Sequence, residues 1–269
     1  MTTRMTVQRL VRLIAAGDVD EVRTAVAENP RLLARAVERD GQGGWTPLHV
    51  AVAEQQEKIV RLLVEAGADL SAPTEQGRTP LHIALEQAPD LVGVLRELGA
   101  PVDAASAAFL GDLDRLREEL ARGAHLSDPV TGVDLLAFAA AGGSVTTARL
   151  LLEHGADPDG GALHAAAAGA HVALVRTLLD AGADADRRDP ESGRTPLHAA
   201  VTAAPDGDAA EIVRALLAAG ADVNATTHDG ASALDISRVA AARSRSADAG
   251  RATGNDALAE LLVAHGATD

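Results

Sequence analysis

The stretch Thr46-Pro47-Leu48-His49-Val50-Ala51 decides the fold of this 269-residue chain. It returns 33 positions later (79 minus 46) as Thr79-Pro80-Leu81-His82-Ile83-Ala84, and again as Thr195-Pro196-Leu197-His198-Ala199-Ala200. Threonine is a favourable helix N-cap, and proline suits the first helical position because no N–H is needed there. Gly67-Ala68-Asp69 follows the first copy, and its glycine suits the left-handed end of a helix. Each unit is therefore predicted to be a turn, a short helix, a second turn and a second helix.

The composition favours small, closely packed helices. Apolar residues make up 47% of the chain, whereas aromatic residues make up only 1%. The 39 acidic and 24 basic side chains give a formal charge of −15, which argues against nucleic acid or an anionic membrane as the partner. The same charge favours a protein partner with a basic face. Cysteine is absent, so disulfides and thiolate chemistry are excluded.

Targeting and membrane segments are not expected either. No apolar run approaches the roughly 18 residues of a membrane span. Arg9 and Arg12 interrupt the apolar N-terminal stretch, which therefore differs from a signal peptide. We expect a cytoplasmic protein.

The threonine of the repeated phrase serves as a register mark along the chain. We expect a single domain over residues 1–269, with an N-terminal cap over about residues 1–45. A C-terminal cap over about residues 232–269 contains an insertion at about residues 240–254. The marks are Gln8, Thr46, Thr79, Val102, Asp134, Gly161, Thr195 and Ser232.

The period, the Thr-Pro-Leu-His-x-Ala phrase and the Gly-Ala-Asp ending resemble the ankyrin repeat family over about residues 8–267. Lys58 is the only lysine, and such use of arginine is typical of a GC-rich bacterial genome. The resemblance implies an all-α solenoid of about eight stacked helix-turn-helix units with short β-hairpin-like fingers. It also implies a non-catalytic monomer that binds another protein on a concave face made by the fingers and first helices. The alternative is a dedicated inhibitor or immunity-type partner of a single enzyme.

The resemblance gives the repeated phrase a structural role. Its threonine caps a helix, and its histidine makes hydrogen bonds that fix the turn and tie neighbouring units together. Because the histidines occupy equivalent positions in successive units, we expect them to be spread out and not to form a metal site. No catalytic residue or cofactor is expected, and the aspartates of Gly-Ala-Asp are interpreted as solvated loop residues. The structural residues are Thr46, His49, Thr79, His82, His164, Thr195 and His198.

The resemblance also selects the partner-binding positions, which lie just before the threonine and seven or eight residues after it. Trp45 stands out because tryptophan is enriched at binding hot spots, although its ring can instead lie along the adjacent finger and shield it. The loops before Val102 and Gly161 are too short for fingers, so we expect a notched rim where a partner element docks over Phe109 and Leu110. The candidates are Gln42, Trp45, Glu54, Glu75, Gln76, Arg78, Glu86, Gln87, Phe109, Leu110, Glu191, Ser192, Arg194, Thr202, His228 and Asp229.

The C-terminal insertion is the one basic segment of note. It contains Arg238, Arg243, Arg245 and Arg251 against a single acid, Asp248. Two interpretations stay open, in which the segment binds an acidic partner or folds back on the acidic side chains of this protein. We expect an extended helix followed by a mobile loop at about residues 246–254.

Overall fold

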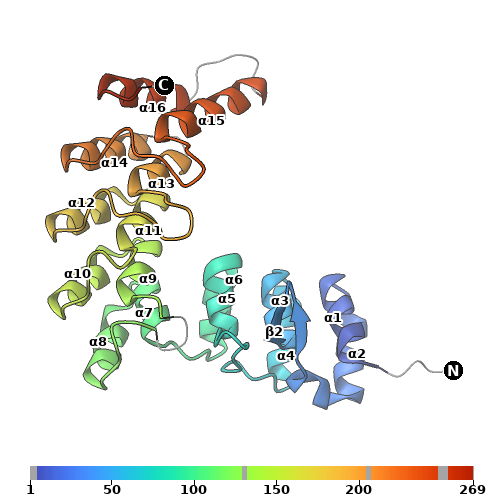
Figure 1. The fold of residues 1–269 in the computed structure, drawn as a ribbon. Coiled ribbons are helices and arrows are strands. Elements are labelled where there is room, and N and C mark those ends of the chain that lie inside the picture. The colour runs from blue at the N-terminus through green and yellow to red at the C-terminus, as the bar shows by residue number, and fades with distance from the viewer. Residues whose placement is uncertain (1–4, 129–131, 204–206, 248–253, 269) are drawn as a thin grey trace. The chain divides into compact units, whose positions relative to one another are not determined.

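The structure is a computed structural model that describes residues 5–128, 132–203, 207–247 and 254–268. These residues form sixteen α-helices, one short 3-10 helix and a two-stranded antiparallel sheet (Figure 1). The predicted helical repeat fold is therefore confirmed. Contacts divide the chain into two compact units: unit 1 is Met1–Ser106, and unit 2 comprises Ala107–Asp128 and Gly132–Asp269. The single domain expected from the sequence stays a prediction.

Unit 1 consists of paired helices in two layers. The first helices α1, α3 and α5 pack on one another in turn, and the second helix α2 packs on α4. Ile14, Leu48 and Leu81 have no more than 1% of their surface exposed and belong to the core between the layers. The elements are α1 (Val7–Ala15), α2 (Val19–Glu28), the 3-10 helix η1 (Pro30–Ala34), β1 (Val37–Arg39), β2 (Gln42–Trp45), α3 (Pro47–Ala53), α4 (Glu57–Glu65), α5 (Pro80–Gln87) and α6 (Asp90–Glu97).

Unit 2 repeats this arrangement. The first helices α9, α11, α13 and α15 pack in succession, as do the second helices α10, α12, α14 and α16. Alanines such as Ala139, Ala166 and Ala200 are fully buried in the first helices, so their backbones can approach closely. The elements are α8 (Leu113–Ala121), α9 (Leu135–Ala141), α10 (Val145–Glu153), α11 (Ala162–Ala168), α12 (Val172–Asp180), α13 (Pro196–Thr202), α14 (Gly207–Ala218), α15 (Ala233–Ala247) and α16 (Gly254–Ala264), while α7 (Ala104–Leu110) contains the boundary between the units.

Polar caps decide where the helices begin. Helix α1 follows Thr6, whose side chain accepts a hydrogen bond from the Arg9 N–H. Helix α7 follows Asp103, whose carboxylate accepts from the Ser106 N–H at 2.8 Å. These caps lie two residues before the mark at Gln8 and one residue after the mark at Val102. The difference arises because short oxygen-bearing side chains such as threonine and aspartate cap helices well, whereas valine cannot accept a hydrogen bond.

The finger that precedes α3 is a β-hairpin. Strands β1 and β2 pair antiparallel, and Asp40 and Gly41 at the turn have φ values of 52° and 76°. Positive φ at both positions is the signature of the tight turn favoured by Asp-Gly. The next loop lies directly against this hairpin, since the Glu75 N–H donates to the Gly43 carbonyl at 3.1 Å. A Cβ at Gly44 would lie 2.5 Å from the Glu75 nitrogen, so only glycine allows this approach.

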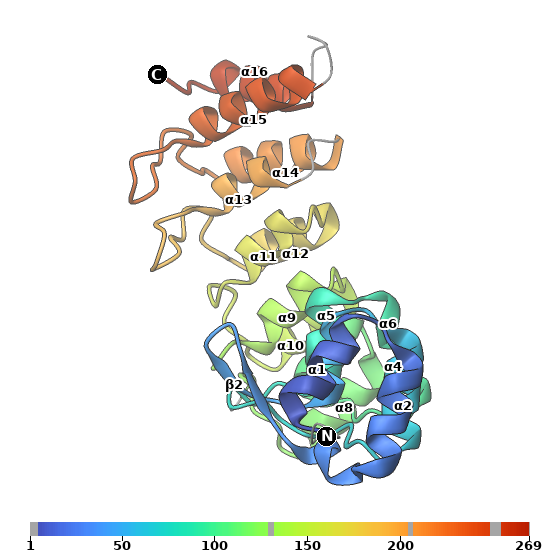
Figure 2. The ribbon, with the colours of Figure 1, turned by 90° about the vertical axis from the view of Figure 1, so that its right-hand side faces the viewer.

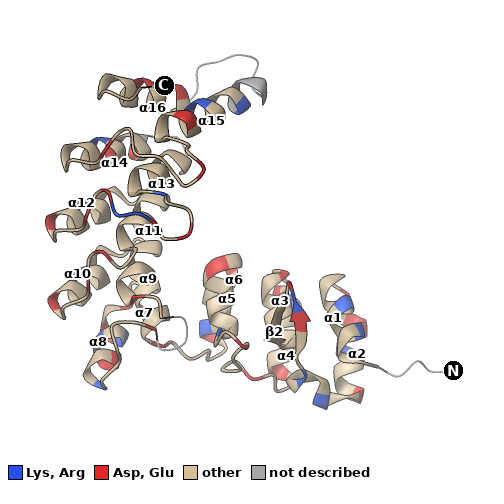
Figure 3. Ribbon diagram, in the orientation of Figure 1, with Lys and Arg blue, Asp and Glu red and all other residues tan. Residues whose placement is uncertain are grey.

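The C-terminal part of unit 2 contains the expected long helix. Helix α15 has fifteen residues, compared with seven in α13, and blue segments of its ribbon mark arginine positions (Figure 3). The loop was expected at about residues 246–254. Residues 248–253, which include Arg251, lie outside the described residues. The described structure likewise does not cover the side chain of Arg245. Within the described ranges, no helix combines the length and the apolar character needed to cross a membrane.

Candidate functional site

The histidines of the repeated phrase join each helix start to the following loop. In His198 the Nδ1 atom accepts from the Thr195 N–H at 3.1 Å and lies 2.8 Å from the Thr195 hydroxyl, which therefore donates to it. The Nε2 atom donates to the Ala231 carbonyl at 3.2 Å. His49 makes the same set of contacts, with its Nε2 atom 3.0 Å from the Arg78 carbonyl. These contacts are of the kind that the family resemblance implies.

The pKa of both His49 and His198 is lowered by burial. Backbone hydrogen bonds raise the pKa of each ring, but by less than burial lowers it. Both rings have no exposed surface. The lowered pKa keeps each ring neutral, which the geometry requires because one ring nitrogen must accept while the other donates. These histidines are therefore occupied inside the fold and offer nothing to a substrate.

Among the described residues, His82 contacts a carboxylate where His49 and His198 contact a carbonyl. Its Nδ1 atom accepts from the Thr79 N–H at 3.1 Å, but its Nε2 atom lies 3.1 Å from the Asp103 carboxylate. Asp103, at the N-cap of α7, here replaces the loop carbonyl that His49 contacts. Burial alone would raise the pKa of Asp103, but contacts with His82 and Ser106 outweigh it and lower the pKa to about 2. The sequence did not point to Asp103, although an aspartate before a helical stretch is an N-cap signal.

The aspartates of Gly-Ala-Asp are also used in the fold. Asp157, Asp184 and Asp222 each accept from the N–H two residues ahead, at 2.9 Å. Between repeats, the Asp184 N–H donates to the Asp159 carboxylate at 2.7 Å, and the Asp222 N–H donates to that of Asp186 at 2.8 Å. Asp157, Asp184 and Asp222 are exposed, and the backbone of Asp184 and Asp222 also links successive loops. Among the described residues, no group of three or more histidine, aspartate and glutamate side chains is placed to hold a metal ion.

Trp45 is buried in unit 1, with 4% of its surface exposed. The Arg39 guanidinium lies over its ring at 5.3 Å from the centroid, and the His49 ring packs edge-on at 6.0 Å. Its indole N–H has no hydrogen-bond partner in the described part of the chain. The role of Trp45 as a partner contact stays a prediction, but its ring has very little surface available for one.

The other candidates in unit 1 lie on the loops and on the ends of α3 and α5. Glu54 pairs with Arg39 at 3.0 Å, and Arg78 pairs with Glu86. Gln87 accepts from the Gln55 side chain through its carbonyl at 3.1 Å. The exposed candidates of this unit are Glu75, Gln76, Glu86 and Gln87, whereas Gln42, Glu54 and Arg78 are half-buried.

Phe109 and Leu110 end α7 and are half-buried. A Cβ at Gly142 would lie 1.8 Å from the Phe109 carbonyl oxygen, so the end of α9 contacts the end of α7 through its backbone. The Thr147 hydroxyl donates to the Ala108 carbonyl at 3.0 Å and holds the same turn. Phe109 is nevertheless partly exposed, and its contact with a partner stays a prediction.

The loops before α13 and α15 project to the same side of unit 2 (Figure 2). They contact each other, because the His228 N–H donates to the Ser192 carbonyl at 2.9 Å and the His228 Nδ1 atom lies 3.1 Å from the Glu191 carbonyl. Ser192 is half-buried, and its N–H and hydroxyl both donate to the Asp189 carboxylate, at 2.8 Å and 2.6 Å. Glu191, His228 and Asp229 are exposed.

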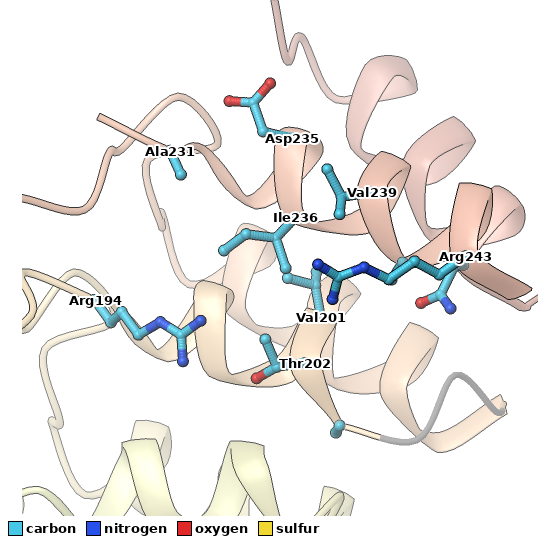
Figure 4. Close-up of a pocket in the computed structure, with 11 residues that line it drawn as sticks. Arg194, Val201, Thr202, Ala231, Asp235, Ile236, Val239 and Arg243 are labelled. Atoms are coloured by element: carbon cyan, nitrogen blue, oxygen red, sulfur yellow. The ribbon is translucent and has the colours of Figure 1, made fainter. Parts of the chain in front are cut away.

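Arg194 and Thr202 are brought together in a cavity of about 570 Å³. The cavity lies between α13 and α15, which are consecutive first helices, and Arg194 enters it from the loop before α13 (Figure 4). Helix α15 contributes Ile236, Val239 and Arg243. Register reasoning on single repeats selected Arg194 and Thr202. Val239 lies seven residues after the mark at Ser232, at the same register position as Thr202, but it was not among the candidates. Ile236 and Arg243 lie outside the register positions at which the family contacts its partners.

Comparisons with known proteins agree with the repeat structure. A family model described as Ankyrin repeats (3 copies) matches residues 10–106, 103–189 and 136–227. These ranges together cover more than half of the chain.

The curated relatives each match only a part of this chain, and the match covers only a part of each relative. Protein fem-1 homolog A of Danio rerio is 34% identical over 123 residues, which are 40% of this chain and 19% of the relative. Protein phosphatase 1 regulatory subunit 27 of Mus musculus is 38% identical over 96 residues, 35% of this chain and 58% of the relative. The tRNA endonuclease ANKZF1 of Homo sapiens is 36% identical over 81 residues, 29% of this chain and 11% of the relative. The chain thus spans less than two thirds of each of these relatives. On the family match, the chain belongs to the ankyrin repeat family, whose repeats generally mediate protein–protein interaction and are generally non-catalytic.

Proposed function

We propose that this protein is a non-catalytic interaction module that binds a partner protein through its loops and first helices. The observation that carries the proposal is the cavity between α13 and α15, because it opens between consecutive first helices and is lined by two residues that the repeat register selects. We assign eight repeats, one to each helix pair, and a bacterial, cytoplasmic, monomeric protein. The exposed contact residues are Glu75, Gln76, Glu86, Gln87, Glu191, Arg194, Thr202, His228 and Asp229.

Site-specific photo-crosslinking in a lysate of the source cell tests which face is used. A photoreactive residue at Gln76 or Thr202 should crosslink to one recurring protein. The matched control places the same residue at Glu65 or Arg214, which are exposed on the second-helix layer at α4 and α14. A partner that crosslinks only from Glu65 and Arg214 would place the interface on the opposite layer.

The half-buried pair Phe109 and Leu110 is proposed as a second contact region, in the notch expected where a finger is missing. Changing both residues to serine should leave the helical content unchanged and abolish capture of the crosslinked protein. Capture at the wild-type level would remove this region from the interface.

The alternative function is that of a dedicated inhibitor of a single enzyme. It is favoured by the relative that is named as a regulatory subunit and that this chain covers to 58%. A dedicated inhibitor would bind its enzyme one-to-one and lower its turnover, whereas an adaptor would leave turnover unchanged. Light scattering of the complex and an activity assay of the captured enzyme separate the two.

A further inference from the structure

The cavity between α13 and α15 has an apolar floor and a basic end on each side. Val201 and Ile236 lie on its floor, and Val239 is 51% exposed at its edge. The guanidinium groups of Arg194 and Arg243 point toward the middle of the cavity from opposite ends (Figure 4). A ligand that lies along this cavity therefore meets two positive charges with apolar surface between them.

Arg194 differs from its counterpart in the third repeat. Arg78 and Arg194 each directly precede the threonine of the repeated phrase, and Arg78 pairs with Glu86, seven residues after that threonine. The residue at the same position in the seventh repeat is Thr202. Its hydroxyl donates to the carbonyls of Ala199 at 2.8 Å and His198 at 3.2 Å, so it is turned to its own helix. The internal acid that satisfies Arg78 is thus missing beside Arg194.

The acid that lines the cavity, Asp235, does not pair with Arg194 in the way that Glu86 pairs with Arg78. Its carboxylate instead accepts hydrogen bonds from the Ser232 N–H at 2.9 Å and from the Ser232 hydroxyl at 2.7 Å. Among the described residues, the ion pairs do not include Arg194 or Arg243. Within the described part of the chain, two guanidinium groups therefore face the cavity with no ion pair to an acidic side chain, and the formal charge of the whole chain is −15.

We propose that this cavity binds an acidic segment of the partner protein, with carboxylates on Arg194 and Arg243 and an apolar side chain on Val201, Ile236 and Val239. The inference rests on the proposed function and names the chemistry that the partner brings. Arginine suits this task because its planar guanidinium can hold a carboxylate through two parallel hydrogen bonds.

A carboxylate segment fits the cavity better than a nucleic acid does. The formal charge of −15 repels a polyanion over the rest of the surface, and binding to phosphates along a backbone needs extended basic surface. The apolar floor between the two arginines favours an aliphatic or aromatic side chain over a sugar-phosphate backbone.

Selection of random dodecapeptides displayed on phage against the full-length protein tests the proposal. We expect the enriched peptides to carry acidic residues on both sides of an apolar residue. Arg194→Ala and Arg243→Ala should each weaken their binding by about tenfold, since hydrogen bonds to charged groups contribute more than neutral ones. The control Arg214→Ala removes the same charge from the exposed face of α14 and should leave affinity unchanged.

Thr202 provides the sharpest variant. Thr202→Glu introduces an acid at the position that Glu86 occupies beside Arg78, so it should pair with Arg194 and compete with the peptides. Thr202→Gln has the same size without the charge, so it should bind the peptides more tightly than Thr202→Glu does. Circular dichroism verifies that each variant is folded. Enrichment of peptides without acids, no enrichment at all, preferential binding of phosphopeptides or RNA, or equal binding by the glutamate and glutamine variants would each overturn the proposal. Crosslinking from Thr202 distinguishes this proposal from the proposed function. If it captures a partner, and if Arg194→Ala and Arg243→Ala bind that partner as the wild type does, the proposed function stands and only the assignment of carboxylates to the cavity fails.

Discussion

Replacing His198 with alanine should cost far more stability than the same change at His164, although both residues occupy the same position of the repeat. His198 is fully buried and contacts the Thr195 N–H, the Thr195 hydroxyl and the Ala231 carbonyl. His164 is half-buried, follows the glycine cap Gly161, and has a hydrogen bond of 3.0 Å to the Arg194 carbonyl. The pair therefore compares a complete set of contacts with a reduced one inside unit 2.

The magnitudes follow from the contacts that each change removes. At His198 the change leaves a buried N–H and a partly buried carbonyl unpaired and opens a cavity, which together cost about 3 to 4 kcal/mol. At His164 one partly exposed hydrogen bond is lost, which costs about 1 kcal/mol. At about 3 °C per kcal/mol, these losses correspond to decreases in midpoint temperature of about 10 °C and about 3 °C.

Thermal unfolding followed by far-ultraviolet circular dichroism measures both changes on the full-length protein. Repeat proteins can unfold in steps, so the transition that shifts is compared between variants in place of a single global free energy. Equal shifts for the two variants, or a larger shift for His164→Ala, would refute the view that the threonine-histidine-carbonyl contacts hold consecutive repeats together.

Three further predictions concern pH and the coupling between repeats. Because burial lowers the pKa of His49 and His198, their contribution to stability should be complete above about pH 6.5 and should decrease as the pH falls below that value. Thermal unfolding midpoints measured between pH 8 and pH 5 should show this decrease. The decrease should be smaller in a variant that carries both His49→Gln and His198→Gln. Asp103→Asn keeps the helix cap but loses the charge facing His82, so it should cost about 1 kcal/mol at pH 7, allowing for the partly exposed carboxylate. Since the pKa of Asp103 is about 2, this deficit should be full above about pH 4 and shrink as the pH falls toward 2, and a deficit that does not change with pH would contradict the assignment. Leu178→Pro should unfold α10 and α14 together with α12, which hydrogen exchange can detect as loss of protection in all three helices.

The repeated phrase made the helix starts predictable wherever it was intact. Thr46, Thr79 and Thr195 each precede a helix that begins at the following proline. Where the phrase was lost, the apolar register indicated the helices but not their first residues, because the caps at Thr6 and Asp103 depend on one polar side chain each. Burial of Trp45 was harder to predict, since it depends on the path of the hairpin and on Arg39, which covers the ring.

The candidate site shows what register reasoning can and cannot find. Counting from Thr195 selects Arg194 and Thr202, but their significance appears only when they are compared with Arg78 and Glu86 in the third repeat. The change from Glu86 to Thr202 at one register position is visible in the sequence, because each repeat serves as a reference for the others, whereas the pairing of Glu86 with Arg78 comes from the structure. Arg243 is different, since it reaches the cavity only because α15 continues beyond the length of the other first helices. Changes of residue within a repeat can therefore be read from the chain, whereas a site that depends on the length of an element requires the structure.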